Sequence, residues 1–209
     1  MLKELPLVID PHVHFRTPGA EHKEDWITAA RAARAGGVGM VFDMPNTSPA
    51  TDSQANLVEK KQLIDKQIAE SDYPLRYKLF FGATPDNSEE IKQLKPAEVA
   101  GVKLYMGSTT GDLLVDKDKY IKDVFTAAKE AGLVVAVHAE DEEIIEANTE
   151  RLQHEEDFSV HSKARSREAA AKAVERAIKI TCEVGNKLYI CHVSSAPELN
   201  LIREAKQAG

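Results

Sequence analysis

The amino-acid sequence predicts an α/β fold, a parallel (β/α)8 barrel of which about six β/α units are present. Short apolar runs alternate with longer amphipathic segments, which is typical of parallel strands with helices packed on them. Polar residues gather where several of these runs end, and barrel enzymes place their active sites there. The first run is followed by RTPGAEHKED, which lacks the glycine-rich phosphate loop of an open nucleotide-binding sheet. These observations favour the barrel over the open sheet.

The expected strands are short, rich in Val, Ile, Leu and aromatic residues, and bounded by turn or polar residues. In chain order they cover residues 7–15, 37–44, 77–83, 101–106, 133–140 and 187–194. Helical patterns cover residues 23–37, 52–71, 118–132, 167–185 and 195–209. Three of these helices have a glycine at the expected position after the last turn: Gly36, Gly132 and Gly185. Because a closed barrel has eight units, two units are absent or the chain is a fragment with open strand edges.

Composition and charge exclude two classes of partner. The net charge is −7 and no basic run occurs, which excludes a nucleic-acid surface. No stretch of about 18 apolar residues could span a membrane, and the N-terminal MLKELPLVID does not resemble a signal peptide. The two cysteines, Cys182 and Cys191, fit a reducing compartment. We therefore expect a cytoplasmic protein, in which an anionic substrate needs a local positive pocket.

The first expected strand carries three polar side chains on one face. Asp10, His12 and His14 are spaced two residues apart, so their side chains point the same way. Two imidazoles on one face can chelate one metal ion, with Asp10 one layer deeper as a supporting group. For an isolated His-x-His pattern, two structural histidines explain the residues equally well.

Two later strands repeat this placement. His138 lies near the end of the fifth strand, and His192 has the equivalent place on the sixth. One histidine in an apolar strand is usually a satisfied core residue, but four at the ends of three strands converge on one barrel mouth. This convergence favours a metal site. Cys191 precedes His192, so it is expected to face the helix layer.

The fourth strand contains Lys103 within GVKLYM. A lysine inside an apolar strand is destabilising unless its charge is lost or compensated. A neutral buried amine can react with carbon dioxide, and the resulting carbamate can bridge two metal ions. Alternatively, Lys103 extends to the rim or pairs with an acid. With four candidate ligands nearby, we favour the bridging role. The acidic run 139–146 is expected to be a solvated helix start.

Five segments together resemble the dihydroorotases of the amidohydrolase superfamily: DPHVHFRTPG, DMPNTSP, GVKLYM, VHAE and YICHVSS. Their order and approximate spacing match across essentially the whole chain, and MPNT favours dihydroorotase over the related allantoinases and hydantoinases. The resemblance implies a barrel of the metallo-dependent hydrolase type with a binuclear zinc centre. His12 and His14 would bind one zinc ion and His138 and His192 the other. Lys103, carboxylated by carbon dioxide, would bridge them.

The resemblance also implies a substrate site and a reaction. Arg16 and Asn46 correspond to residues that bind the substrate carboxylate. Thr109 lies in the segment 107–113, which resembles a mobile loop that closes over the substrate. The implied activity is the reversible hydrolysis of (S)-dihydroorotate to N-carbamoyl-L-aspartate in de novo pyrimidine (UMP) biosynthesis. A zinc-activated hydroxide would attack the cyclic amide carbonyl.

The chain departs from the family in two ways. The family's proton-shuttling aspartate lies on the last barrel strand, which is absent here, and the small β domain built from both termini is also missing. We therefore expect residues 1–209 to be a single partial barrel domain without a separate β-sandwich domain, and to be weakly active or inactive alone. The exposed edges predict a homo-oligomer or marginal stability, with possible association with aspartate transcarbamoylase. The alternatives are an allantoinase or hydantoinase, or a non-catalytic dihydroorotase-like scaffold for aspartate transcarbamoylase.

Overall fold

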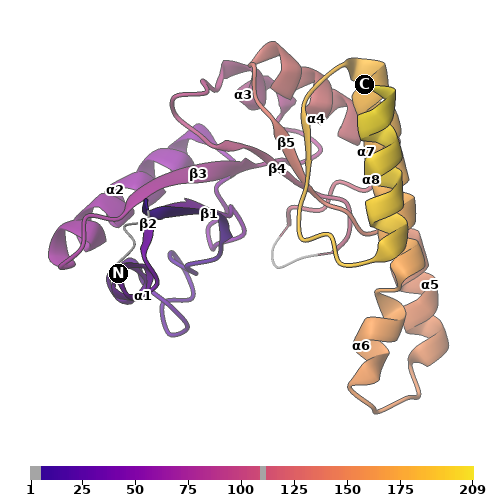
Figure 1. Cartoon of the computed structure of the whole chain (residues 1–209), viewed down its shortest axis with the longest axis horizontal. Helices are drawn as coiled ribbons and strands as arrows, with labels where there is room; N and C mark the ends of the chain where they lie inside the picture. Colours follow the sequence, from indigo (N-terminus) through magenta and orange to yellow (C-terminus); the bar gives the residue numbers. More distant parts are fainter. Residues whose placement is uncertain (1–5, 109–111) are drawn as a thin grey trace, which may run out of the picture.

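Six parallel strands form one curled sheet in a computed structural model that describes residues 6–108 and 112–209 (Figure 1). Each strand pairs with the next in chain order, as predicted for consecutive β/α units. The strands are β1 (Val8–Val13), β2 (Val38–Asp43), β3 (Arg76–Gly82), β4 (Gly101–Tyr105), β5 (Val135–His138) and β6 (Leu188–Ile190). The sheet is therefore a partial barrel, open between β1 and β6.

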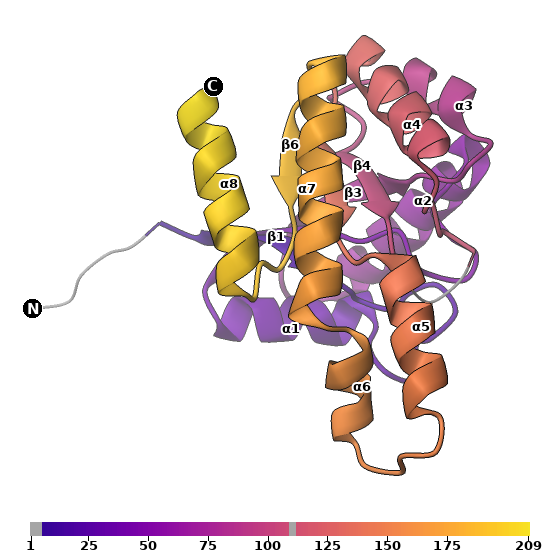
Figure 2. The same ribbon diagram turned by 90° about the vertical axis from the view of Figure 1, so that its right-hand side faces the viewer.

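Helices cover the outer side of this sheet (Figures 1 and 2). They are α1 (Trp26–Ala35), α2 (Gln54–Glu70), α3 (Ser88–Gln93), α4 (Asp118–Glu130), α5 (Glu142–Leu152), α6 (Ser159–Ala164), α7 (Arg167–Val184) and α8 (Ala196–Ala208). The sequence patterns did not predict α3 and α6, and they indicated only the start of α5. Two of these are single short segments of six residues, too short to show a helical period. Figure 2 shows α5 and α6 as a hairpin that projects beyond the sheet.

The helix ends follow local chemistry. Asp25 begins α1, with its carboxylate accepting from the backbone N of Thr28 at 2.7 Å. After α4 and α7, Gly132 and Gly185 have φ of 70° and 75°, the left-handed conformation expected of a terminating glycine. After α1 the expectation was one residue early, because Gly36 is still right-handed and Gly37 has φ of 73°.

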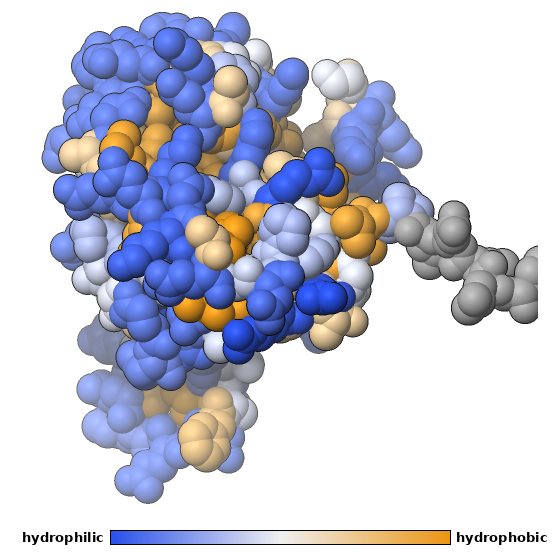
Figure 3. All heavy atoms as spheres, turned by 90° about the vertical axis from the view of Figure 1, so that its left-hand side faces the viewer, coloured by the Kyte–Doolittle hydropathy of each residue, from blue (hydrophilic) through white to orange (hydrophobic). Residues whose placement is uncertain are grey.

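Burial divides the sheet into a covered middle and two open edges. All five residues of β4 are buried, and Trp26 of α1 is fully buried against Phe15 and Tyr77. At the β1 edge, Leu7, Val8 and Ile9 are 58%, 56% and 54% exposed. The β6 edge also exposes apolar side chains: Tyr189, Val193 and Leu199. Figure 3 shows apolar side chains exposed among hydrophilic ones on one face of the molecule. The predicted exposed edges are therefore confirmed.

None of the helices formed by the described residues combines the length and the apolar character that crossing a bilayer requires.

Candidate functional site

The end of β1 presents a pair of imidazoles. Nε2 of His12 lies 3.3 Å from Nε2 of His14, and Nδ1 of His14 donates to Oδ1 of Asn46 at 2.8 Å. Because the amide oxygen only accepts, His14 carries its proton on Nδ1 and turns the lone pair of Nε2 toward His12. Asp10 stabilises the local backbone and does not bond to an imidazole ring, since its Oδ1 accepts from the backbone N of His12 at 3.1 Å.

A second pair of imidazoles lies at the ends of β5 and β6. Nδ1 of His138 is 3.0 Å from Nε2 of His192. The backbone of His192 has φ of 36°, an unusual conformation for a residue other than glycine, and such positions cluster at functional sites. The rings of His12 and His192 lie 5.5 Å apart, centroid to centroid, so the two pairs share one mouth. The four predicted histidines are therefore brought together from three strands.

Lys103 points into the barrel beneath these imidazoles. Its side chain is 1% exposed, and Nζ lies 3.1 Å from Sγ of Cys191 and 4.9 Å from the centroid of the Tyr105 ring. Among the described residues no carboxylate forms an ion pair with Lys103. Burial lowers the pKa of its amine, which favours the neutral, nucleophilic form. In the part of the chain that the structure describes, Lys103 neither extends to the rim nor has an acid partner.

The expectation for Cys191 is wrong. Cys191 was expected to face the helices, but it points inward at Lys103. The left-handed backbone at His192 breaks the strand alternation there, so two consecutive side chains both turn toward the barrel mouth.

The electrostatics of the mouth favour the neutral form of three of the imidazoles. Burial, with the Lys103 charge second, lowers the pKa of His12 from 6.5 to about 4. Burial and the nearby His138 lower the pKa of His192 to the same value. Burial and the Arg16 charge also lower the pKa of His14. Since metal ions bind the neutral imidazole, these side chains are ready to coordinate at neutral pH.

The donor set fits metal ions held by pairs of histidines. Zinc–nitrogen bonds of about 2.0–2.1 Å in a tetrahedron place two ligand nitrogens about 3.3 Å apart. The two observed separations are 3.3 and 3.0 Å. Within residues 6–108 and 112–209, no group of three or more His, Cys, Asp and Glu side chains has the arrangement to hold one ion. Each pair therefore needs a further ligand, for which the buried Lys103 amine lies nearby.

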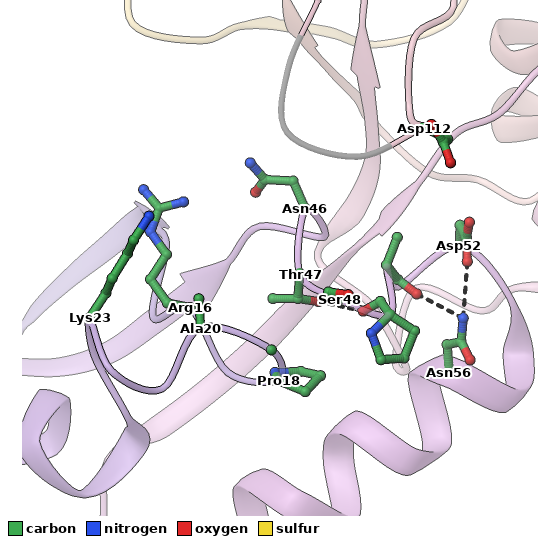
Figure 4. Close-up of a pocket in the computed structure, with 13 residues that line it drawn as sticks. Arg16, Pro18, Ala20, Lys23, Asn46, Thr47, Ser48, Asp52, Asn56 and Asp112 are labelled. Atoms are coloured by element: carbon green, nitrogen blue, oxygen red, sulfur yellow. Dashed lines mark hydrogen bonds between the residues drawn. The ribbon is translucent and has the colours of Figure 1, made fainter.

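A pocket of about 570 Å³ opens beside the first histidine pair. Arg16 and Lys23 extend along one side of it, and Asn46 projects into the same space (Figure 4). Arg16 has φ of 64°, and no carboxylate among the described residues pairs with it. Positive charge is therefore local to the side of the pocket that holds Arg16 and Lys23, while Asp52 and Asp112 line other parts of it. Asn46 connects pocket and histidines, because its oxygen is bonded to His14 while its amide N–H groups remain for a ligand. Thr109 lies outside the described residues.

The acidic run after β5 was wrongly expected to be solvated. Asp141 and Glu142 are 1% and 8% exposed. Asp141 caps α5 and pairs with Lys172 and Arg176, at 3.1 Å each. Glu140 accepts from Nε2 of His138 at 2.8 Å. The strand spacing could have revealed this last contact, because a residue two positions after His138 lies on the same face.

Metal-free protein provides the first test, a dependence of stability on pH. Folded His12 and His192 protonate near pH 4, whereas the unfolded chain protonates near 6.5. The unfolded state therefore binds more protons between these values, so the free energy of unfolding falls as pH drops from 6.5 to 4. Urea denaturation across this range should show a shallower pH dependence for His12→Gln. Replacement of the exposed His154 by Gln is the control. An unchanged slope in His12→Gln would contradict the assignment.

The family follows from comparison with known proteins. Residues 4–198 match a family model described as dihydro-orotase-like. The chain belongs to this family. A dihydroorotase of Methanosarcina mazei is 33% identical over 97% of this chain and 43% of its own length. An allantoinase of Deinococcus radiodurans is 33% identical over the whole chain and 46% of its own length.

A solved structure of the L-hydantoinase (dihydropyrimidinase) from Arthrobacter aurescens shares the fold of this family member. It superposes with a TM-score of 0.89 at 25% identity, covering 98% of this chain and 45% of the hydantoinase. Together with the six-stranded sheet, this likeness confirms the predicted partial barrel of the metallo-dependent hydrolase type. The chain spans less than half the length of these relatives.

Proposed function

We propose that this chain forms the metal-binding part of a dihydroorotase, which interconverts (S)-dihydroorotate and N-carbamoyl-L-aspartate in pyrimidine biosynthesis. One observation carries the proposal: four imidazoles and a buried amine meet at a mouth beside a pocket that contains Arg16 and Lys23. The imidazoles and the amine suit metal-assisted hydrolysis, and the pocket suits an anionic substrate. The family includes relatives named dihydroorotase at 30–34% identity.

Two zinc ions would be held by the pairs His12–His14 and His138–His192, and Lys103 would bridge them as a carbamate. The neutral Nζ of Lys103 forms a bond to the carbon of carbon dioxide and releases a proton, which leaves a carboxylate-like group. Bound zinc supplies a water of lowered pKa and polarises the carbonyl under attack. The low pKa values of His12 and His192 keep both lone pairs available for coordination.

Arg16 and Asn46 would bind and orient the substrate. The guanidinium can make two charge-assisted hydrogen bonds to a carboxylate, which fixes the ring relative to the histidines. Asn46 adds an N–H donor from a side chain that His14 already holds in place. Dihydroorotate has such a carboxylate, whereas allantoin and hydantoin are neutral rings, so the guanidinium of Arg16 favours dihydroorotate.

An assay of dihydroorotate, allantoin and hydantoin tests the substrate. The protein used should extend this chain through the remaining barrel strands, because the chain spans less than half the length of its relatives. Preferential turnover of dihydroorotate supports the proposal, and preferential turnover of allantoin or hydantoin overturns it.

Zinc content separates an enzyme from a scaffold: about two ions per chain fit the proposed site, and none fits a non-catalytic protein. Co-purification tests the predicted association with aspartate transcarbamoylase.

Arg16→Met in the same extended protein should lower kcat/KM for dihydroorotate by about 10- to 150-fold, since hydrogen bonds to a charged group contribute about 1.5–3 kcal/mol. Zinc content should not change, because Arg16 donates nothing to a metal. Lys78→Met, which alters a lysine bonded to the carbonyl of Pro96, serves as the control. Equal loss of activity toward a neutral cyclic amide would contradict a carboxylate-binding role.

A further inference from the structure

The imidazole of His138 is held at both ring nitrogens. Nδ1 faces Nε2 of His192 at 3.0 Å, and Nε2 lies 2.8 Å from Oε2 of Glu140. The same oxygen of Glu140 accepts from the guanidinium of Arg165, directly after α6. These contacts are largely enclosed, since the side chains of His138, Glu140 and Arg165 are 21%, 19% and 25% exposed.

This arrangement determines where the proton of His138 lies. A guanidinium only donates and a carboxylate only accepts, so the oxygen shared with Arg165 must receive the hydrogen of His138 Nε2. In the neutral ring Nδ1 is then the unprotonated nitrogen. That nitrogen is the one beside His192. Glu140 therefore selects the tautomer in which the lone pair of His138 faces the second histidine pair.

Arg165 extends the arrangement to another part of the chain. Its second terminal nitrogen donates to the carbonyl of Ser108 at 3.0 Å. The backbone N of Ser108 in turn donates to Oε2 of Glu142 at 2.6 Å. The segment that follows β4 is thus fastened to the α5–α6 hairpin by both its N–H and its C=O.

We propose that Glu140 and Arg165 are positioning residues, which hold His138 as the Nε2–H tautomer with Nδ1 directed to the metal site and fasten the segment after β4 to this geometry. Hydrogen bonds to the distal nitrogen of a metal-binding histidine typically set both its tautomer and its orientation. The part of the inference that names a metal ion as the ligand of His138 rests on the proposed function. The tautomer itself is a property of the metal-free chain.

Nitrogen-15 NMR of the imidazoles in the metal-free 209-residue chain tests the tautomer, with His138→Gln to assign the signals. Wild-type His138 should be protonated on Nε2. Glu140→Ala should populate both tautomers and weaken the binding of Zn²⁺ by about 10- to 100-fold, measured by competition with a chromophoric chelator. Glu140→Gln keeps an acceptor oxygen and should recover the Nε2–H tautomer and most of the affinity. Arg165→Met should give a smaller loss than Glu140→Ala.

The hairpin provides matched controls. Glu155 and Lys163 form an exposed ion pair of 2.6 Å that does not reach His138. Glu155→Gln and Lys163→Met remove the same charges and should leave both the tautomer and the Zn²⁺ affinity unchanged. Circular dichroism monitors folding of each variant. If Glu140→Ala does not fold, the tautomer of the wild type and the Zn²⁺ affinity of Arg165→Met test the inference.

Protonation of wild-type His138 on Nδ1 overturns the inference, as does Zn²⁺ affinity in Glu140→Ala or Arg165→Met equal to that of the wild type. The outcome is distinguishable from failure of the proposed function. A chain with the Nε2–H tautomer whose extended form hydrolyses none of the three cyclic amides keeps the positioning role, while the assigned reaction fails.

Discussion

Lys103→Met should make the metal-free chain more stable and at the same time abolish the proposed bridged metal site. The amine of Lys103 is buried with Sγ of Cys191 as its hydrogen-bond partner. An apolar side chain of similar length removes a poorly compensated polar group, whose burial costs about 1–3 kcal/mol. The free energy of unfolding should therefore rise by up to about that amount in urea denaturation.

Zinc analysis of the same variant should show the opposite effect. Without the Lys103 nitrogen no carbamate can form, so the two histidine pairs lose their common ligand. Zinc content should fall from about two ions per chain, and the extended protein should lose its hydrolytic activity. Lys78→Met, on the neighbouring strand β3, is the matched control and should leave the zinc content unchanged. A variant of Lys103 that keeps two zinc ions would refute the bridging role.

Lys60→Met should destabilise the chain by about 3–5 kcal/mol, the typical result of removing one partner of a buried ion pair. Nζ of Lys60 lies 2.7 Å from Oδ2 of Asp43, and the two side chains are 2% and 0% exposed. The substitution leaves the Asp43 carboxylate buried without its cation. Asp43 also accepts from the backbone N of Phe15 at 2.9 Å, so the start of the loop that carries Arg16 should loosen as well.

Urea denaturation measures this loss, and two variants calibrate it. Lys66→Met changes an exposed lysine on the same helix and should alter the free energy of unfolding by no more than about 0.5 kcal/mol. The double variant Lys60→Met with Asp43→Asn removes the uncompensated charge but keeps an oxygen for Phe15. It should recover part of the stability. A Lys60→Met protein as stable as Lys66→Met would show that the pair contributes nothing.

Strand alternation explains why the histidines were predictable. His12, His14 and His138 lie on or directly after strands, where a spacing of two residues and a position at the strand end indicate direction. Lys103 was recognisable because a charged residue in a buried strand is rare. Local sequence rules were sufficient for all four.

The rest of the site depends on backbone conformation and long-range packing. The left-handed φ of His192 turns its imidazole to the same side as Cys191, and no residue type in YICHVSS signals it. The pair of Lys60 with Asp43 joins a helix to a strand end that is 17 positions away in sequence. Arg165 reaches Glu140 only because α5 and α6 form a hairpin. Such contacts require the three-dimensional path of the chain.

The placement of the two histidine pairs has a mechanical consequence. His12 and His14 lie at the free edge formed by β1, and His192 follows the free edge formed by β6. Along the backbone these edges are connected only through all the intervening strands, yet the rings of His12 and His192 are 5.5 Å apart. A ligand shared by both pairs therefore connects the β1 edge to the β6 edge, and its binding free energy opposes flattening of the curved sheet.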